Sequence, residues 1–394
     1  MSGPTFRSVR RNPGASAQVI KQFPSGLLVP AGWSGIQNPA YPVRYVPGPA
    51  VQRFPLSMSA RERNHDLSGY CSQWRQLNTS AGVHDATAVA RIDTWLNQCE
   101  ADGIEVIWTV FGTPSWIART TPNHTDQYGS LYGANVPTDL SSSGCPSVEA
   151  HVTWLLNRYN TGGRKRIHYI EAWNEPLYST AASTYWTGTY QEMAQMTKAV
   201  YQAAKAVDPS VIVTSPGFAG MAGGLFPMVR NTLDAPVGDG TLCKEWCDAI
   251  AFHPYSLGVA RYPLHASHEL KQFFIDCELS APNLPIYNTE VGFLQDWAIS
   301  QEDRARIIKQ HALTLAANGV KMVQWYSADS GVGTGSNIPA SYVADNIIGG
   351  PLVDPTIRAA FEWVQALGGR TLYEVGYRTG NVMYAVTDQG TVSA

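Results

Sequence analysis

The sequence predicts an α/β protein built as a (β/α)8 barrel, the TIM-barrel architecture, with a short C-terminal β appendage. Two observations predict this fold. Short apolar runs recur along the chain, and the segments between them carry apolar residues three and four positions apart, as amphipathic helices do. Because each run is followed by a crossover segment, we expect parallel strands that close into a barrel.

The eight apolar runs are the predicted strands. Six of the eight runs are nearly continuous in apolar residues, as is typical of strands buried on both faces. An open doubly wound sheet is the competing architecture, but no glycine-rich phosphate turn follows the first strand, which favours the barrel. The predicted strands are 26–31, 55–59, 104–111, 167–173, 211–215, 248–252, 285–289 and 321–326.

Helices are expected between these strands. Val89, Ile92, Leu96 and Cys99 follow one another at steps of three and four, which places them on one helix face. The same spacing recurs in the segments 148–159, 193–207 and 357–367. The last of these is followed by Gly368 and Gly369, which are typical of a helix C-terminus.

The two ends of the chain differ from the middle. Residues 1–24 are polar and irregular, so we expect an N-terminal arm, followed by a catalytic barrel over residues 25–369. Residues 370–394 contain two strand-like runs around Thr379, Gly380 and Asn381, which indicates a small β-hairpin appendage.

Composition limits the classes of partner. The formal net charge is −3, which argues against a nucleic-acid partner, because such proteins carry a basic surface. No apolar stretch approaches 18 residues, so no membrane span is expected. We expect no cofactor and no metal, since His, Cys and Asp residues do not cluster with metal-ligand spacing. The sequence leaves the oligomeric state open.

Two glutamates carry the predicted chemistry. Glu175 follows the fourth predicted strand in "IEAWNEPLY", and Glu290 ends the seventh in "LPIYNTEVGF". Catalytic groups of barrel enzymes lie at the carboxyl ends of the strands, and the fourth and seventh strands face each other across the barrel mouth. Two carboxyl groups that face one gap can cleave a glycosidic bond, one acting as a protonated acid and the other as an ionised nucleophile.

The motifs around these residues resemble those of the clan A retaining glycoside hydrolases. Within the clan, the sequence is most similar to family 39, the β-xylosidases and bacterial exopolysaccharide glycosidases. The order of "RNHD", "TVFGTPSW", "WNEP", "FHPY" and "NTEVG" carries the resemblance, which spans about residues 25–370. "WNEP" with a distant "TEVG" is a specific signal, whereas "TPSW" alone is weak. The long polar segment 31–66 departs from the family pattern.

The resemblance implies roles for individual residues. Glu175 is expected to be the general acid and then the general base, and Glu290 the nucleophile. A further set is expected to bind the sugar or orient these carboxylates: Asn174, His253, Tyr255, Trp325, Trp116 and Arg63. Within that set, Trp325 is expected to form a stacking floor under the reacting sugar. Glu171, on the fourth strand, is expected to support the site by hydrogen bonds.

The predicted function is therefore a retaining β-glycoside hydrolase acting on a β-linked oligo- or polysaccharide. Two alternatives stay open: a non-catalytic sugar-binding barrel and a metal-dependent hydrolase. Within the enzyme class, exo action of the β-xylosidase kind and endo action on a polysaccharide are also both open. Glycan degradation favours an extracellular or periplasmic location, although the first 24 residues lack the apolar centre of a secretory signal.

Overall fold

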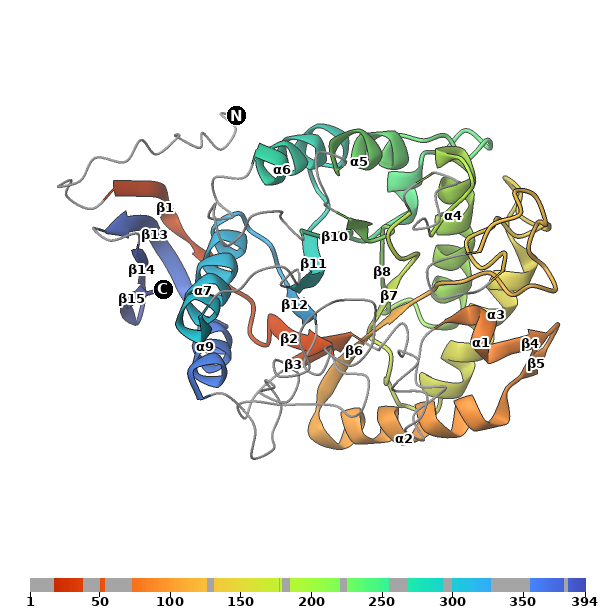
Figure 1. The fold of residues 1–394 in the computed structure, drawn as a ribbon, viewed down its shortest axis with the longest axis horizontal. Helices are drawn as coiled ribbons and strands as arrows, with labels where there is room; N and C mark the ends of the chain where they lie inside the picture. The colour runs from red at the N-terminus through yellow and green to blue at the C-terminus, as the bar shows by residue number, and fades with distance from the viewer. Residues whose placement is uncertain are drawn as a thin grey trace.

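A computed structural model gives the fold of the protein (Figure 1). The structure describes residues 18–37, 50–53, 73–125, 131–176, 178, 185–219, 225–254, 268–292, 300–326, 355–378 and 382–394.

Parallel strands occupy the centre of the molecule in two sheets. One sheet has the order β2-β12-β11-β10-β9 and the other β3-β6-β7-β8. An isolated parallel bridge between Thr214 and Ala249 joins the second sheet to the start of β10, and β2 lies close to β3. The strands are β2 (Ser34–Gln37), β3 (Ala50–Arg53), β6 (Ile104–Thr109), β7 (Tyr169–Glu171), β8 (Ile212–Thr214), β9 (Phe218–Ala219), β10 (Ile250–His253), β11 (Ile286–Gly292) and β12 (Val323–Tyr326).

Helices surround these strands in Figure 1. They are α1 (Trp74–Leu77), α2 (Ala86–Asp102), α3 (Pro146–Tyr159), α4 (Tyr190–Val207), α5 (Leu225–Leu233), α6 (His268–Ser280), α7 (Gln301–Ala317) and α9 (Pro355–Gln365), with a 3-10 turn η2 (Cys243–Trp246). The predicted helical segments are confirmed. In α2, for example, Ile92, Leu96 and Cys99 are all buried. No helix within the described residues is long and apolar enough to cross a membrane.

Local signals explain where the helices begin and end. Asp85 caps α2 by accepting from the backbone N–H of Ala88, and Gly103 ends it with φ of 62°, a left-handed conformation that glycine adopts without steric cost. Thr189 and Glu192 form a reciprocal capping box at the start of α4. These short-range devices fix the point at which each helix departs from the strand before it.

Two large apolar cores fill most of the space between strands and helices. One packs β6, β7 and β8 against α2, α3 and α4, and the other packs β10, β11 and β12 against α5, α6, α7 and α9. Much of the aromatic content lies in these cores, since Trp33, Trp74, Trp95, Trp108, Trp173 and Trp186 are fully buried. The high tryptophan content is thus mainly a packing feature.

The N-terminal part of the fold corrects two predictions. Residues 26–31 do not form the first central strand, because residues 18–28 belong to β1 (Gln18–Leu28), which pairs antiparallel with β13 (Thr371–Arg378). For the same reason residues 18–24 are strand rather than irregular arm. The first two central strands are β2 and β3 instead. The predicted strand 55–59 lies outside the described residues.

The C-terminal hairpin is present and is part of a larger sheet. The strand β13 pairs with β14 (Val382–Thr387), which pairs in turn with β15 (Gly390–Ser393), giving the order β1-β13-β14-β15. Figure 1 places this sheet beside α7 and α9, away from β6 and β7. We call it the terminal sheet. The division of the chain into an arm, a barrel and an appendage stays a prediction.

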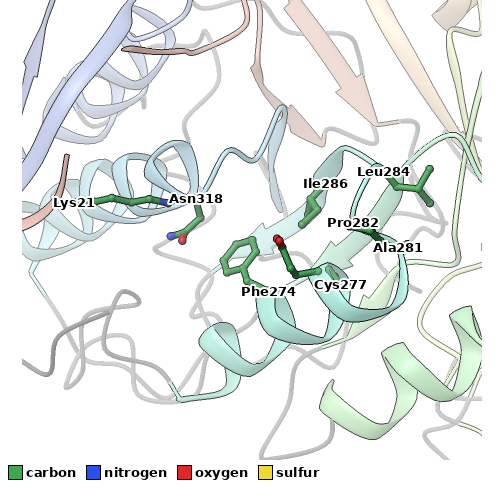
Figure 2. A pocket seen from close by; sticks show the side chains of 9 residues that line it. Lys21, Phe274, Cys277, Ala281, Pro282, Leu284, Ile286 and Asn318 are labelled. Atoms are coloured by element: carbon green, nitrogen blue, oxygen red, sulfur yellow. The ribbon is translucent and has the colours of Figure 1, made fainter. Parts of the chain in front are cut away.

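A pocket lies where the terminal sheet meets the central part of the fold (Figure 2). The space between its walls is about 430 Å³, part of which is open solvent. The lining residues include Lys21, Phe274, Cys277, Leu284 and Asn318. Lys21 donates from Nζ to the carbonyl of Ala317, 2.8 Å away, and so ties β1 to the end of α7. Ile286 at the start of β11 also lines the pocket, so the pocket lies at the opposite end of β11 from Glu290.

Candidate active site

Glu175 stands on a constrained turn just beyond β7. Its φ is 43°, a left-handed value that is uncommon for a residue other than glycine and that often marks functional sites. Its backbone N–H donates to the carbonyl of Gly217 at 3.0 Å, and the preceding Asn174 forms a parallel bridge with the same glycine. The turn is thus fixed to the segment after β8, and the Glu175 side chain is 17% exposed.

Glu290 lies near the end of β11 at an irregularity in the sheet. The register of β11 with β12 shifts between Asn288 and Val291, which is where Glu290 sits. Such irregularities re-aim side chains next to active sites. The side-chain amide of Asn288 donates to the carbonyls of Phe252 and Glu290, at 3.0 and 2.7 Å, and holds the strand in this shape. Glu290 is 8% exposed.

The structure brings Glu175, Glu290 and His253 together. One side-chain oxygen of each glutamate and one ring nitrogen of His253 all lie within 4.8 Å of one another. His253 ends β10, which lies between β9 and β11 in its sheet. Glu290 is on β11, and the backbone of Glu175 is hydrogen-bonded to Gly217, just before β9. Three predicted site residues from distant parts of the sequence therefore share one location.

His253 is fully buried within a polar network. Its Nδ1 lies 2.8 Å from Oε1 of Glu175, and its Nε2 lies 3.1 Å from the hydroxyl of Thr289 and 3.4 Å from Oε2 of Glu171. Burial by itself lowers the pKa of a histidine, but the negative charge of Glu290 and the contacts with Glu171 and Glu175 outweigh it and raise the pKa of His253 to about 9. The imidazole is therefore a cation at neutral pH.

Two further residues support this network. Glu171, at the end of β7, has no exposed side-chain surface and accepts at Oε1 from the hydroxyl of Thr109, 3.1 Å away. This agrees with the supporting role expected for Glu171. Gly217 packs against the ring of His253, because a β-carbon at this position would lie 2.4 Å from Nε2 of His253 and 3.0 Å from Oε2 of Glu171.

Gly217 is not among the site residues that the sequence predicts. The available signal was weak: a glycine directly after the strand-ending Ser215 and Pro216, at the edge where strand ends carry the predicted chemistry. Its close approach to His253 depends on a contact between residues distant in the sequence, which an alternation pattern does not encode.

The other predicted site residues have different outcomes. Asn174 is 3% exposed beside Glu175, in the predicted region. Trp116 follows β6, is 37% exposed and donates from Nε1 to the carbonyl of Asn78 at 3.1 Å. Arg63 and Tyr255 lie outside the described residues.

Trp325 does not fit its predicted stacking role. The side chain is 3% exposed and lies on the helix side of β12, where it stacks on His311 of α7 and meets the edge of Phe361 of α9. Side chains alternate between the two faces of a strand, and Val323 and Trp325 both belong to the core outside the central strands. A ring packed in this way forms no floor under a sugar.

The cluster of Glu175, His253 and Glu290 has a spacing at which a metal ion can be held. A histidine ligand must, however, present an unprotonated nitrogen. In this structure each ring nitrogen of His253 faces an oxygen of the protein instead, Nδ1 that of Glu175 and Nε2 that of Thr289. The arrangement is that of a hydrogen-bonded acid–base cluster.

Comparisons with known proteins agree with this fold. No protein-family model matches the sequence, and no similar sequence was found among curated proteins. Solved structures of glycoside hydrolases do match, and the chain shares its fold with members of clan A.

Three of the matching structures illustrate the likeness. A family 39 β-xylosidase from Caulobacter crescentus is 19% identical with a TM-score of 0.55, over 95% of this chain and 77% of the xylosidase chain. A glucosidase from Croceicoccus marinus is 16% identical with a TM-score of 0.58, over 92% and 72%. A family 30 xylanase catalytic domain from Talaromyces cellulolyticus is 13% identical with a TM-score of 0.53, over 94% and 85%. At these identities the likeness is one of fold.

Proposed function

We propose that the protein is a retaining β-glycoside hydrolase in which Glu175 is the acid/base and Glu290 the nucleophile. One observation carries the proposal: carboxylate oxygens of the two glutamates lie within 4.8 Å of each other at the carboxyl ends of their strands. Retaining enzymes hold their carboxyl groups about 5–5.5 Å apart, whereas inverting enzymes leave about 6.5–9.5 Å for a water molecule. The short separation supports retention.

The reaction then runs in two displacements. In the first, an oxygen of Glu290 attacks the anomeric carbon while Glu175 gives its proton to the departing glycosidic oxygen, which leaves a glycosyl ester on Glu290. In the second, Glu175 removes a proton from water, the water oxygen attacks the same carbon, and Glu290 departs as a carboxylate. Two inversions give net retention, and Glu175 ends protonated as it began.

The proposal includes closure of the central strands into a (β/α)8 barrel. Parallel pairing runs from β2 through β12 and β11 to β10, and from β8 through β7 and β6 to β3. The bridge at Thr214 and Ala249 and the close approach of β2 to β3 support closure at the two remaining junctions. The fold shared with clan A enzymes agrees with this arrangement.

Asn174 is proposed to bind the substrate beside Glu175, where its amide can bond the 2-hydroxyl of the reacting sugar. Trp116, Tyr255 and Arg63 are proposed to line the same subsite. The exposed ring of Trp116 after β6 supports its part of this assignment, since an exposed aromatic face can stack on a sugar.

The proposed substrate is a β-linked oligo- or polysaccharide. The solved structures that share the fold include a β-xylosidase, a glucosidase and a xylanase, which supports a saccharide substrate. Exo action and endo action are both candidate modes. Product analysis on aryl β-xylosides, aryl β-glucosides and xylan decides between these modes. A non-catalytic sugar-binding barrel is the rival, and any catalysed release of an aryl group from these glycosides rejects it.

The decisive experiment separates the roles of the two glutamates. Glu290→Ala removes the nucleophile, so turnover should fall by more than about 10⁴-fold for every substrate. Azide should restore activity by attacking the unblocked face of the sugar, giving a glycosyl azide of inverted configuration. The anomeric configuration of this azide is measured by NMR.

Glu175→Ala should behave differently. Dinitrophenyl glycosides need no proton on the leaving group, so the glycosyl-enzyme still forms and accumulates for lack of a base. Azide should then release a product of retained configuration, and substrates with poor leaving groups should react about 10²–10⁴-fold more slowly than with the wild type. Glu100→Ala is the control, because Glu100 is a surface residue paired with Arg166. Exchanged azide configurations in the two variants would mean that the roles are reversed.

A further inference from the structure

Glu171 is a buried carboxylate for which the two displacements give no task. It sits four residues before Glu175, on the same strand-and-turn segment, with no exposed side-chain surface. Oε1 accepts from Thr109 at 3.1 Å, and Oε2 lies 3.4 Å from Nε2 of His253. A buried charge is costly unless it is paired, so Glu171 and a cationic His253 stabilise each other.

His253 links Glu171 to the proposed acid/base. Its two ring nitrogens face opposite ways, with Nε2 toward Glu171 and Thr289 and Nδ1 toward Oε1 of Glu175, 2.8 Å away. Among the described residues, the charged groups that act on the ring are Glu171 and Glu175 from β7 and the turn after it, and Glu290 from β11. All three are carboxyl groups, and all three favour the imidazolium.

The protonation state of His253 decides where the acid proton of Glu175 resides. When the imidazole carries both protons, Nδ1–H donates to Oε1, and a proton on Glu175 must therefore sit on Oε2. When the imidazole has lost one proton and donates from Nε2 to Glu171, Nδ1 accepts instead. The proton of Glu175 is then held on Oε1, facing the ring rather than the leaving group.

We propose that Glu171 is a positioning residue: by holding His253 and keeping Nδ1 a donor, it directs the acid proton of Glu175 to Oε2, from which the leaving group is protonated. The inference rests on the proposed function, and it adds a task for the Glu171–His253 pair. The pKa of about 9 for His253 agrees with it, because the ring then stays cationic through the neutral range. Gly217 keeps the space that this ring orientation needs.

The kinetic test uses Glu171→Gln, which keeps the shape of the side chain and removes its charge. On phenyl β-xyloside or β-glucoside, whichever the wild type cleaves, kcat should fall about 10–100-fold, the usual loss when a partner that orients a reacting group is removed. On the dinitrophenyl glycoside of the same sugar the first step needs no proton, so the rate constant of that step should fall by no more than about threefold. Equal losses on both substrates overturn the proposal.

Two variants separate the charge of Glu171 from simple packing. Glu171→Asp keeps the charge and should retain the leaving-group dependence of the wild type. Glu105→Gln is the matched control, because Glu105 lies on the neighbouring β6 and accepts from the hydroxyl of Tyr169 at 2.7 Å, in a different layer of the same strands. If kcat of Glu105→Gln becomes as dependent on the leaving group as kcat of Glu171→Gln, the proposal is overturned.

A measurement without substrate keeps this inference distinct from the proposed function. The imidazole of His253, assigned by its loss in His253→Asn, is titrated by NMR in the wild type and in Glu171→Gln. We expect a pKa near 9 in the wild type, and a value lower by at least about one pH unit in the variant. A neutral His253 at pH 7 in the wild type overturns the inference even if Glu171→Gln does not fold. If the wild type cleaves no glycoside, the proposed function fails, together with the delivery of the proton to a leaving group.

Discussion

The inner and outer sides of β10, β11 and β12 each bury a histidine, and the two histidines differ in charge. On the inner side, carboxyl groups raise the pKa of His253 to about 9. On the outer side, His311 of α7 lies against Trp325, with the ring centroids 5.9 Å apart. Neither ring nitrogen of His311 has a hydrogen-bond partner among the described residues, and burial lowers its pKa to about 3.

Burial alone therefore does not determine the charge of a histidine in this fold. Both rings are removed from water, which by itself disfavours the cation. Three carboxyl groups reverse that preference for His253, whereas the ring of Trp325 offers His311 no opposite charge. The same strands therefore present a charged layer to the proposed substrate side and an uncharged packing layer to the helices.

The largest expected effect comes from crowding the inner side. Gly217→Ala adds a methyl group where only 2.4 Å separates it from Nε2 of His253. Because a shift of about 1 Å in a reacting group costs up to about 100-fold, kcat should fall about 10–100-fold. Steady-state kinetics measures this effect, with urea unfolding to follow the stability loss of about 1–3 kcal/mol that overpacking causes.

Gly188→Ala is the matched control for that variant. A β-carbon at Gly188 would lie 2.5 Å from Cγ2 of Val136 and 2.8 Å from Nε1 of Trp186, so it is similarly crowded but touches none of the proposed catalytic residues. It should lose stability and keep its kcat. Wild-type kinetics for Gly217→Ala would show that the position of His253 does not matter for catalysis.

A smaller effect is expected on the outer side, and it concerns stability. The pKa of His311 is about 3 in the folded protein and about 6.5 when unfolded, so the unfolded state binds more protons between these values. The stability that the neutral ring contributes is present above pH 6.5 and is lost as the pH falls toward 3. The free energy of unfolding of the wild type should fall by about 2 kcal/mol between pH 7 and pH 5 because of this histidine, and His311→Leu should not show this fall.

Urea unfolding of the wild type and His311→Leu at pH 7 and pH 5 measures this difference. His151→Leu should behave in the same way, because burial lowers the pKa of His151 to about 3 and its ring packs on Trp74. An unchanged acid sensitivity in both variants would contradict the uncharged state assigned to the outer histidines.

The removal of metal ions is expected to have no effect on the activity of the inner side. Treatment with a chelator such as EDTA, followed by a hydrolysis assay, should leave kcat unchanged, because the cationic His253 is not available as a ligand. Activity that is lost with the chelator and restored by added Zn²⁺ or Mg²⁺ would replace the acid–base cluster with a metal centre.

The central part of the fold was predictable because its strands are buried on both faces. Runs such as "IEVIWT" in β6 and "IAF" in β10 are nearly continuous in apolar residues, and the amphipathic helices between them are regular. The first strands were not predictable in the same way. The strand β2 is the short "SGIQ", whereas the more apolar "GLL" nearby ends β1 and belongs to the terminal sheet. Apolar content identifies buried strands, but not the sheet to which each belongs.

The approach of the charged residues was predictable, and the side of the sheet on which the aromatic ones lie was less so. His253 ends β10, Glu290 lies near the end of β11 and Glu175 follows β7. Because the carboxyl ends of parallel strands meet, the approach of these three residues follows from their places along the strands. The face of the sheet on which Trp325 lies depends on the register of β12, because a shift of one residue exchanges the two faces. The contact of Gly217 with His253 depends on distances below the resolution of any sequence pattern.

The pairing of β1 with β13 bears on how the chain is made. During synthesis β1 emerges before the central strands, whereas its hydrogen-bonding partner β13 follows only after the central part of the fold has been translated. At about 5–20 residues per second this delay lasts tens of seconds. Throughout that time the nascent chain carries an unpaired strand, a template for association with other chains. The terminal sheet therefore cannot form until β13 has been translated, after the central part of the fold.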